Sequence, residues 1–471
     1  MNKLSTQNIN ISIINLISDI AEKENVEIYL VGGFVRDLIL ERKSKDIDIL
    51  VIGNGIDFAN VVAKKTNGKI QVFKNFGTAM LRTKDYEIEF VGSRKESYKT
   101  NSRKPIIEEG SLEDDLSRRD FTINTLAISL NRMNYGEIVN LFDGVNDLKR
   151  KIIKTPKDPQ VTFHDDPLRM FRAARFASQL NFKIDKKNID FIKKEKNRID
   201  IISKERINVE LNKILMSKKP SIGFKALNET GLLKIILPEI CDLHGVDEIE
   251  GKKHKDNFHH TLKVVDNICE KTNKLWLRWV ALLHDIGKSR TKKFHKKIGW
   301  TFHGHEYVGS KMVDKIFKRL KLPLNDKLSY VKKLVSLSSR PIILSLESIT
   351  DSAVRRLIYD AGEDIDDLLT LCEADITTKN EYLQKKYLNN FKVVREKIKT
   401  VEERDHIRNF QPPVSGEEIM NYFNLRPCKE IGIIKDFIKE SILNGDITNS
   451  YEEAKELMIK KGKTLGLNVN E

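Results

Sequence analysis

The chain has 471 residues, of which 40% are hydrophobic and 32% charged, and its 83 Lys and Arg against 68 Asp and Glu give a formal net charge of +15. This length predicts two to four domains, and the positive excess favours a polyanionic partner, with a merely Lys-rich solvated surface as the alternative. The four cysteines form no C-x-x-C pair, which argues against a disulfide scaffold or a zinc knuckle. No run approaches the roughly 20 apolar residues of a membrane span. We therefore expect a soluble, cytoplasmic protein.

The N-terminal part of the chain predicts a small mixed α/β domain. Apolar residues at helical spacing predict an amphipathic helix over residues 10–24, where the continuous apolar stretch of a signal peptide is absent. A short apolar run at residues 26–31 predicts a buried strand that ends at Gly32-Gly33, and a helical pattern follows. Further strands are predicted from β-branched and aromatic content at residues 47–52, 69–73, 78–82 and 86–91.

Beyond residue 167 the strand signals nearly vanish, and the remainder of the chain is expected to be mostly α-helical. A basic, polar stretch at residues 251–255 is interpreted as a linker. Pro412-Pro413 predict the end of one helix, and Ser415 with Glu418 predict a capping box that starts another. The predicted helices include residues 166–180, 205–216, 261–270, 275–287 and 352–362.

The Gly32-Gly33 turn is the first candidate binding element. Two glycines before a helix allow the backbone to approach a phosphate closely, and the helix N-terminus offers unpaired N–H groups. Arg36 lies one turn into this helix and could reach the same anion. An ordinary strand-to-helix connection is the competing interpretation of the turn alone.

Asp46 and Asp48 are the candidate catalytic residues. Residues i and i+2 of a strand face the same side, so the two carboxylates project together, an arrangement that a bound cation stabilises. Mg²⁺ suits it, because this ion binds a few carboxylates and keeps positions for phosphates and water. A neighbouring strand supplies a third acid, for which we prefer Glu89 over Glu87. An exposed Asp pair on an edge strand is the alternative.

Five segments resemble, in order, the motifs of the class II RNA nucleotidyltransferases, which include tRNA CCA-adding enzymes and bacterial poly(A) polymerases and belong to the DNA polymerase beta superfamily. The segments are VGGFVRDLILERKSKDIDIL (31–50), LEDDLSRRDFTINTLA (112–127), LFDGVNDL (141–148), DDPLRMFRAARFASQLNF (165–182) and SKERINVELNKIL (203–215). The resemblance implies a polymerase beta-like head in which Asp46, Asp48 and Glu89 hold two Mg²⁺ ions, about 3.5 to 4 Å apart, that activate an RNA 3′-hydroxyl and neutralise the triphosphate.

The same resemblance implies a set of nucleotide-binding residues. Asp166 and Arg169 would read the edge of the incoming base, and the next two arginines of that helix would help to bind the triphosphate. Glu205 and Arg206 match residues thought to support the head and the neck. A surface ion-pair cluster and a solvated basic helix face are the alternatives for these segments taken alone. The implied nucleotide-binding residues are Gly32, Gly33, Arg36, Arg119, Asp120, Asn124, Asp166, Arg169, Arg172 and Arg175.

A second group of candidate residues resembles the HD domain, whose members hydrolyse phosphate esters. His284 and Asp285 lie side by side on an apolar helix, where two polar groups need partners. Imidazole and carboxylate ligands suit a divalent transition metal or Mg²⁺. Further histidines stand at 303 and 305, and the implied metal ligands are His260, His284, Asp285 and Asp375.

This HD-like segment departs from the family pattern at Ser338, where related sequences typically place a histidine before Arg-Pro. The departure argues against a two-metal centre and leaves a set of residues that could hold one metal. A degenerate domain, retained as a structural or RNA-contacting bundle, is the alternative.

The expected fold class is therefore α+β, with a small mixed α/β head followed by mostly α-helical domains. The expected divisions are a nucleotidyltransferase head (1–150), a helical neck (151–240), an HD domain (241–400) and a helical tail (401–471) that, by the family resemblance, lies near the tRNA elbow.

The expected function is addition or repair of the 3′-terminal CCA of tRNA from CTP and ATP. Within the family, a poly(A) polymerase or an enzyme adding only A is the alternative. From other classes, the alternatives are an HD phosphohydrolase with a vestigial head and a non-catalytic RNA-binding protein.

Overall fold

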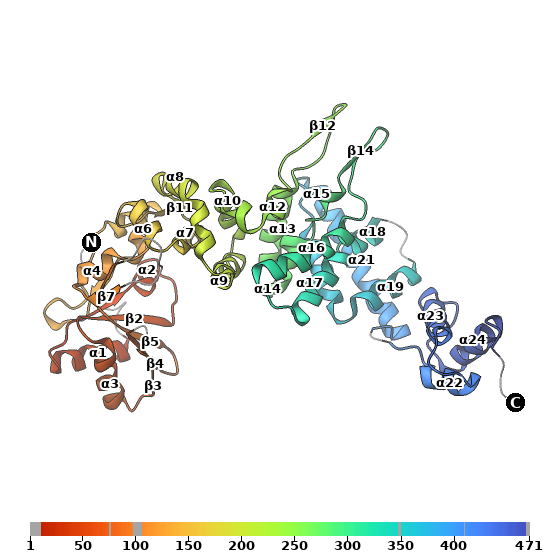
Figure 1. The fold of residues 1–471 in the computed structure, drawn as a ribbon, viewed down its shortest axis with the longest axis horizontal. Helices are drawn as coiled ribbons and strands as arrows, with labels where there is room; N and C mark the ends of the chain where they lie inside the picture. Colours follow the sequence, from red (N-terminus) through yellow and green to blue (C-terminus); the bar gives the residue numbers. More distant parts are fainter. Residues whose placement is uncertain (1–10, 75–76, 98–105, 347–349, 409, 468–471) are drawn as a thin grey trace. The chain divides into compact units, whose positions relative to one another are not determined.

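In the computed structural model the described residues are 11–74, 77–97, 106–346, 350–408 and 410–467 (Figure 1). The chain forms two compact units. The first unit comprises Met1–Ile214 with Ile222–Ile235, and the second comprises Leu215–Ser221 with Ile236–Glu471. Each unit is described separately below.

A seven-stranded sheet organises the N-terminal part of the first unit, in the order β3-β4-β5-β2-β1-β8-β9. The central neighbours β2 and β5 are parallel, and every other neighbouring pair is antiparallel. Parallel neighbours need a crossover connection, which the segment containing α3, β3 and β4 provides. The strands are β1 (Ile28–Val31), β2 (Asp46–Val51), β3 (Ile70–Phe73), β4 (Thr78–Arg82), β5 (Glu87–Gly92), β8 (Ala127–Ser129) and β9 (Ile138–Val139).

The remaining elements of this sheet region are short helices and a separate strand pair. Asn54 caps α3 by accepting hydrogen bonds from two backbone N–H groups of its first turn, and Ser111 with Asp114 forms a capping box on α4. The elements are α1 (Ser12–Lys23), α2 (Gly33–Ile39), α3 (Gly55–Thr66), β6 (Arg94–Ser97), β7 (Ile106–Glu109), α4 (Leu112–Ser117), the 3₁₀ helix η3 (Thr122–Asn124), η4 (Arg132–Asn134) and α5 (Gly144–Arg150).

The rest of the first unit is nearly all helical. Pro167 stands at the N-cap of α7, and Asn181 ends that helix in the left-handed conformation, with φ 57°. Its elements are β10 (Ile152–Ile153), α6 (Pro159–Asp165), α7 (Leu168–Leu180), β11 (Lys183–Ile184), α8 (Lys186–Glu195), the 3₁₀ helix η5 (Lys196–Ile201), α9 (Lys204–Leu215), α10 (Pro220–Glu229) and α11 (Leu232–Ile236).

The second unit is a helical assembly with two short hairpins. The hairpins pair β12 (Glu248–Ile249) with β13 (Lys252–Lys253), and β14 (Lys293–His295) with β15 (Gly299–Thr301). Its helices are α12 (Pro238–Cys241), α13 (Asn257–Lys271), α14 (Leu275–Leu283), α15 (Lys288–Thr291), α16 (His305–Leu320), α17 (Asp326–Leu337), α18 (Arg340–Leu346), α19 (Asp351–Ala361), η6 (Gly362–Asp364), α20 (Ile365–Ala374), α21 (Glu381–Asp405), α22 (Gly416–Phe423), α23 (Lys429–Asn444) and α24 (Tyr451–Thr464).

The predicted fold class is confirmed: a mixed α/β head precedes a mostly helical remainder (Figure 1). The predicted N-terminal helix forms as α1, and the predicted strands that carry Asp48 and Glu89 form as β2 and β5. Residues 251–255, interpreted as a linker, include the two-residue strand β13. Of the capping box predicted for Ser415 and Glu418, the N-cap half is present, because the Ser415 hydroxyl accepts a hydrogen bond from the backbone N–H of Glu418 at 3.1 Å.

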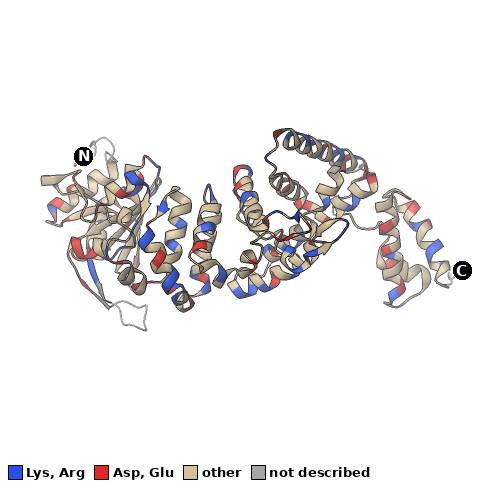
Figure 2. Cartoon of the chain, turned by 90° about the horizontal axis from the view of Figure 1, so that it is seen from above, with Lys and Arg blue, Asp and Glu red and all other residues tan. Residues whose placement is uncertain are grey.

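Charged residues of both signs are interspersed along the helices of both units, so the net positive charge is not confined to one element (Figure 2). Among the described helices, none combines the length and the apolar character that a membrane crossing requires.

Candidate active site

The candidate site in the first unit begins at the turn between β1 and α2. Gly32 has φ +72° and ψ −134°, a conformation that residues with a side chain rarely adopt. A Cβ at this position would lie 2.9 Å from Nη1 of Arg119 and 3.2 Å from Oδ2 of Asp48. The turn therefore brings the backbone against both a guanidinium and a carboxylate, and glycine is required for that approach.

The candidate catalytic carboxylates share one face of the sheet. In the parallel pair of β2 and β5, Asp48 stands opposite Glu89 and Asp46 stands opposite Glu87. The intervening Ile47 is fully buried on the other face. Glu87 forms an ion pair with Arg82 at 3.3 Å, which leaves Glu89 as the acid beside Asp48. The three acids named from the sequence are thus neighbours on adjacent strands.

The surroundings of Asp48 suit a divalent cation. Burial raises the pKa of Asp48 to about 6; Glu89 and Asp46 raise it as well, and Arg119 and Arg36 oppose the rise. Negative groups that disfavour one another's ionisation in this way are stabilised by a metal ion. Among the described residues, however, the sets of three or more ligand groups that converge within 4.8 Å lie in the second unit, so these head carboxylates are more widely spread.

Two arginines beside the carboxylates are held by a buried acid that the sequence analysis did not identify. Asp115 is fully buried and accepts hydrogen bonds from Arg118 and, at 2.8 Å, from Nη2 of Arg119. Burial would raise the pKa of Asp115, but the two guanidinium groups outweigh it and lower the pKa. The spacing of three and four residues along α4 is the sequence signal that could have revealed this clamp.

A continuous hydrogen-bond chain joins four of the predicted nucleotide-binding residues, Arg36, Asn124, Asp120 and Arg172. Arg36 donates from Nη1 to Oδ1 of Asn124 at 2.7 Å, and Asn124 donates from Nδ2 to Asp120 at 2.9 Å. Arg172 donates from Nε to the other oxygen of Asp120 at 2.7 Å. Burial raises the pKa of Asp120, but Arg172 and Asn124 outweigh it and lower the pKa to about 2. The carboxylate is therefore ionised at neutral pH and orients the groups around it.

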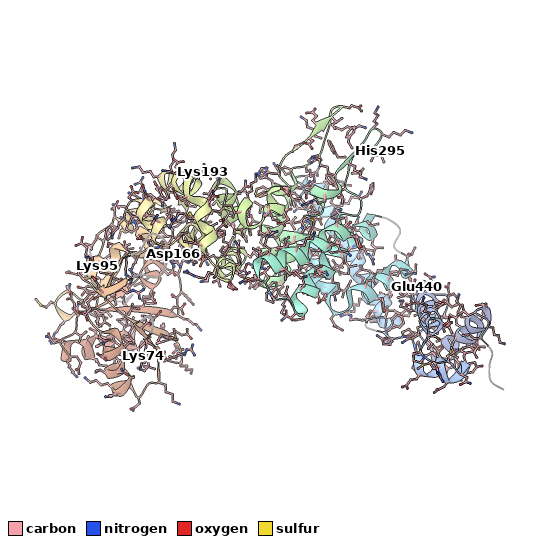
Figure 3. All side chains as sticks on the ribbon, viewed as in Figure 1. Lys74, Lys95, Asp166, Lys193, His295 and Glu440 are labelled. Carbon is pink, nitrogen blue, oxygen red and sulfur yellow. The ribbon has the colours of Figure 1, made fainter. Side chains whose placement is uncertain are left out.

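Asp166, which lies between α6 and α7, and the arginines of α7 line a cavity of ≈ 470 Å³. Asp166 is labelled in Figure 3. Oδ1 of Asp166 accepts a hydrogen bond from the backbone N–H of Leu168 at 3.1 Å, and Oδ2 lies 3.4 Å from Arg206. Arg169 donates to the backbone carbonyl of Arg118 at 2.6 Å. The cavity is lined by residues of four of the five candidate motifs, all except 141–148, including Gly32, Gly33, Arg36, Asp48, Arg119, Asp120, Asn124, Asp166, Arg169, Arg172 and Arg175.

The aromatic ring of Phe176, which was not singled out from the sequence, supports the arginines of this cavity. Guanidinium carbons of Arg175, Arg36 and Arg172 lie 3.9, 5.2 and 5.4 Å from its centroid. Cation–π contacts of this kind hold the like-charged groups together. Arg175 also pairs with the buried Glu210 at 2.6 Å, another residue that the sequence analysis did not identify.

The HD-like residues form a second candidate centre, in the second unit. Nε2 of His260 lies 2.8 Å from Oδ1 of Asp375 and 3.6 Å from Oδ2 of Asp285. Nε2 of His284 lies 3.3 Å from Asp285 and 3.5 Å from Asp375. The four predicted ligands are thus brought together from α13, the end of α14 and the end of α20.

Buried polar atoms without hydrogen-bond partners indicate that this second centre suits a metal ion. Nδ1 of His284 contacts the carbonyl oxygen of Ala281 at 2.9 Å, while its Nε2 has no hydrogen-bond partner. Oδ1 of Asp375 is likewise buried and makes no hydrogen bond of good geometry, although Nε2 of His260 lies 2.8 Å from it. Burial lowers the pKa of His284, but Asp285 and Asp375 outweigh it and raise the pKa to about 10, so the two acids favour a cation between these side chains.

The remaining HD-like residues differ in their roles. Nε2 of His305 lies 3.5 Å from Oδ1 of Asp285, whereas His303 is exposed. Ser338 is buried and donates from its hydroxyl to the carbonyl oxygen of Val335 at 3.0 Å. Lys288 donates to Oδ2 of Asp285 at 2.7 Å, so an ammonium group occupies one side of the cluster.

Comparisons with known proteins agree with this arrangement. Three family models match the chain: "Poly A polymerase head domain" at residues 28–154, "Probable RNA and SrmB- binding site of polymerase A" at residues 181–243, and "HD domain" at residues 257–380.

Among curated relatives, the chain is 31% identical over 385 residues to the multifunctional CCA protein of Haemophilus influenzae, covering 77% of this chain and 87% of that protein. It is 33% identical over 298 residues to the A-adding tRNA nucleotidyltransferase of Aquifex aeolicus, covering 60% of this chain. The match spans only 34% of the length of the A. aeolicus protein, and a similar match spans 27% of its Geobacter sulfurreducens counterpart.

A solved structure shares the fold at lower sequence identity. The complex of a CCA-adding enzyme with CTP matches with a TM-score of 0.63 and 21% identity, over 99% of this chain and 97% of that one.

Proposed function

The chain belongs to the family of tRNA nucleotidyltransferases and poly(A) polymerases, and on that premise we propose that it adds or repairs the 3′-terminal CCA of tRNA from CTP and ATP. The observation that carries the proposal is the alignment of Asp48 with Glu89 across β2 and β5, beside the cavity that Gly32 and Arg169 also line. Relatives named for CCA addition and for A addition are both similar to this chain, so the choice of nucleotides is the point to test.

The head carboxylates of Asp46, Asp48 and Glu89 would hold Mg²⁺. When bound, that ion supplies activation of the RNA 3′-hydroxyl and neutralisation of the charge on the phosphates. The backbone N–H groups at the start of α2 and the side chains of Arg36 and Arg119 bind the triphosphate by charge-assisted hydrogen bonds. Their positions are held in advance, by Asn124 and by Asp115, which lowers the cost of ordering them on binding.

Asp166 and Arg169 would select the base. A carboxylate accepts and a guanidinium donates hydrogen bonds, so the pair complements the amino group and ring nitrogen that cytosine and adenine share. Oδ2 of Asp166 faces Arg206, and Arg169 donates to the carbonyl groups of Arg118 and Thr162. Base binding therefore exchanges some of these contacts for contacts with the nucleotide.

The test of this function is incorporation into tRNA that ends immediately before CCA, with each of the four nucleotides alone and with CTP and ATP together. The proposal expects C addition from CTP alone and ordered addition of C, C and A from the mixture. Addition of A without any use of CTP would move the assignment to the A-adding or poly(A) branch of the family.

A second activity is favoured by the convergence of the four HD-like side chains and by the absence of a well-formed hydrogen bond at Nε2 of His284 and Oδ1 of Asp375. We propose that His260, His284, Asp285 and Asp375 hold one divalent ion, Mg²⁺ or a transition metal, for phosphate-ester hydrolysis. Hydrolysis of bis-p-nitrophenyl phosphate that is abolished by chelation and by His284→Gln is the expected result. Equal hydrolysis by His284→Gln would remove this proposal while leaving CCA addition untouched.

We also propose the functional division expected from the sequence: head 1–150, neck 151–240, HD domain 241–400 and tail 401–471. The family models that match residues 28–154, 181–243 and 257–380 support the first three of these parts. We propose a cytoplasmic location, because the proposed substrates are tRNA and free nucleotides.

A further inference from the structure

A second histidine and carboxylate cluster lies in the second unit, separate from the four HD residues. It consists of His244, three residues after α12; Asp256, the N-cap of α13; and His259, in the first turn of α13. One ligand atom from each of the three residues lies within 4.8 Å of the others. Neither the proposed nucleotidyl transfer nor the proposed phosphate-ester hydrolysis uses these side chains.

The ligand atoms are close enough together for a zinc site. Nδ1 of His244 lies 3.3 Å from Oδ2 of Asp256, and Nδ1 of His259 lies 3.1 Å from Oδ1 of the same carboxylate. Zinc bonds of about 2.0 to 2.2 Å at tetrahedral angles separate neighbouring ligand atoms by roughly 3.3 to 3.6 Å. The two imidazoles approach different oxygens of the carboxylate at distances close to this range. A Zn²⁺ ion bound to one of these oxygens would therefore draw the other imidazole toward it.

The three side chains are also oriented by contacts outside the cluster. The backbone N–H of His259 donates to Oδ1 of Asp256 at 2.9 Å, and that of Gly245 donates to Oδ2 at 3.1 Å. The ring of His244 stacks on Phe258 with centroids 4.4 Å apart and an interplanar angle of 18°. Contacts of this kind fix ligand orientation in metal sites. They leave a further lone pair on each carboxylate oxygen for a cation.

Charge and exposure are compatible with a bound cation. Burial raises the pKa of Asp256, but the backbone N–H groups of His259 and Gly245 outweigh it and lower the pKa, so the side chain is a carboxylate at neutral pH. The side chains of His244, Asp256 and His259 are 41%, 21% and 57% exposed, which leaves solvent access for a water molecule as fourth ligand. The positive end of the α13 dipole opposes a cation, and the Asp256 carboxylate offsets it.

We propose that His244, Asp256 and His259 form a Zn²⁺ site distinct from the HD centre. The ion joins the segment after α12 to the first turn of α13. The next residue of that turn is His260, so zinc at this site also restrains the backbone that carries an HD residue. The competing arrangement has no ion, and both imidazoles simply donate hydrogen bonds to Asp256.

The test is a Zn²⁺ titration of the metal-free full-length chain in competition with a chromogenic chelator. The double variant His244→Gln/His259→Gln should lose one zinc equivalent that the unaltered chain binds. Asp256→Asn should weaken that equivalent at least tenfold, and it is informative because asparagine still caps the helix. His303→Gln, which changes an exposed histidine outside both clusters, is the matched control and should retain all equivalents. His284→Gln should remove only zinc bound at the HD centre.

Thermal unfolding gives a second readout that does not depend on enzymatic activity. Zn²⁺ should raise the melting temperature of the His284→Gln chain, and the gain should disappear when His244→Gln and His259→Gln are added. The same zinc stoichiometry and affinity in the unaltered chain and in the His244/His259 double variant would overturn the proposal. Zinc binding that occurs only at millimolar concentration in both proteins would overturn it as well.

Discussion

At the scale of single residues, the head centre is defined by how its charges are balanced. Asp48 is surrounded by two acids and two arginines, and burial with the acids outweighs the arginines. Asp120, by contrast, is held ionised by Arg172 and Asn124. The negative charge of Asp48 is therefore not fully balanced by its arginines, which suits a metal ligand. The charge of Asp120 is balanced, and this carboxylate serves to position its neighbours.

The metal-free protein should reveal the unfavourable charge of Asp48 through pH. An acid whose pKa is raised on folding, here from 3.8 to about 6, destabilises the folded state as pH rises through that interval. Without metal, Asp48→Asn should therefore gain stability relative to the unaltered chain between pH 4 and pH 6.5, by at most about 3 kcal/mol. Chemical unfolding of both proteins in EDTA measures this gain, and Mg²⁺ should reverse it at pH 7.5. A difference that does not vary with pH would contradict the assigned charge balance.

Asp166 and Arg169 should govern which nucleotide is used. Asp166→Ala and Arg169→Ala remove the hydrogen-bonding groups proposed to read the base, so preference for CTP and ATP over UTP and GTP should fall about a hundredfold in kcat/KM. Single-nucleotide incorporation into tRNA measures the ratio. Arg118→Ala is the comparison, because it alters a neighbouring arginine of the same cavity that has no proposed role in base reading; an equal loss of selectivity there would contradict the assignment.

At the scale of elements, the turn between β1 and α2 determines how closely the backbone approaches the carboxylates. The positive φ of Gly32 and the nearness of Arg119 and Asp48 act together at this position. Gly53 offers a contrast, because it also has a positive φ, +112°, but no atom lies within 4 Å of the place where a Cβ would be.

Gly32→Ala should therefore lower the rate of nucleotidyl transfer at least about a hundredfold. A shift of the catalytic groups by about 1 Å costs this much even when every catalytic side chain is still present. Gly53→Ala should cost only stability, about 1 to 3 kcal/mol, through backbone strain. Steady-state transfer and thermal unfolding of both variants check the pair. Comparable activity losses would show that strain, rather than the approach to Arg119 and Asp48, accounts for the effect.

The elements that sequence alone predicts are those whose pattern is local. The alternation of Asp46, Ile47 and Asp48 indicates a strand with acids on one face, and β2 has that arrangement. Strand β8 has only three residues, and the β12–β13 hairpin has two-residue strands, so neither is long enough to establish an alternating pattern. The role of Phe176 depends partly on Arg36, which folding brings to it from a distant segment, so motif spacing could not single it out.

At the scale of the whole molecule, the two units contain different candidate chemistries. The first unit contains the carboxylate face and the arginine-lined cavity, and the second contains the HD cluster and the His244 cluster. The net charge of +15 is distributed along the chain, with acidic and basic side chains interspersed on the helices (Figure 2). Recognition of a long polyanion would therefore use many separate phosphate contacts.

Binding of tRNA should depend strongly on salt. Each phosphate contact releases counterions, so affinity should fall at least about tenfold between 50 and 200 mM salt. Filter binding or fluorescence anisotropy across that range gives the slope. Affinity that scarcely changes would mean that contacts to the phosphate backbone are not the main source of binding.

The central claim is tested most directly by incorporation of labelled CTP and ATP into tRNA that ends before CCA, with the unaltered chain and with Asp48→Asn. The account predicts ordered addition of C, C and A by the unaltered chain. Asp48→Asn, which retains size and polarity but removes the charge, should lower this addition by at least about a hundredfold, because loss of a direct metal ligand should exceed the roughly 10- to 100-fold effect of its outer-shell partners. Addition of A alone, no addition, or full activity in Asp48→Asn would contradict the account.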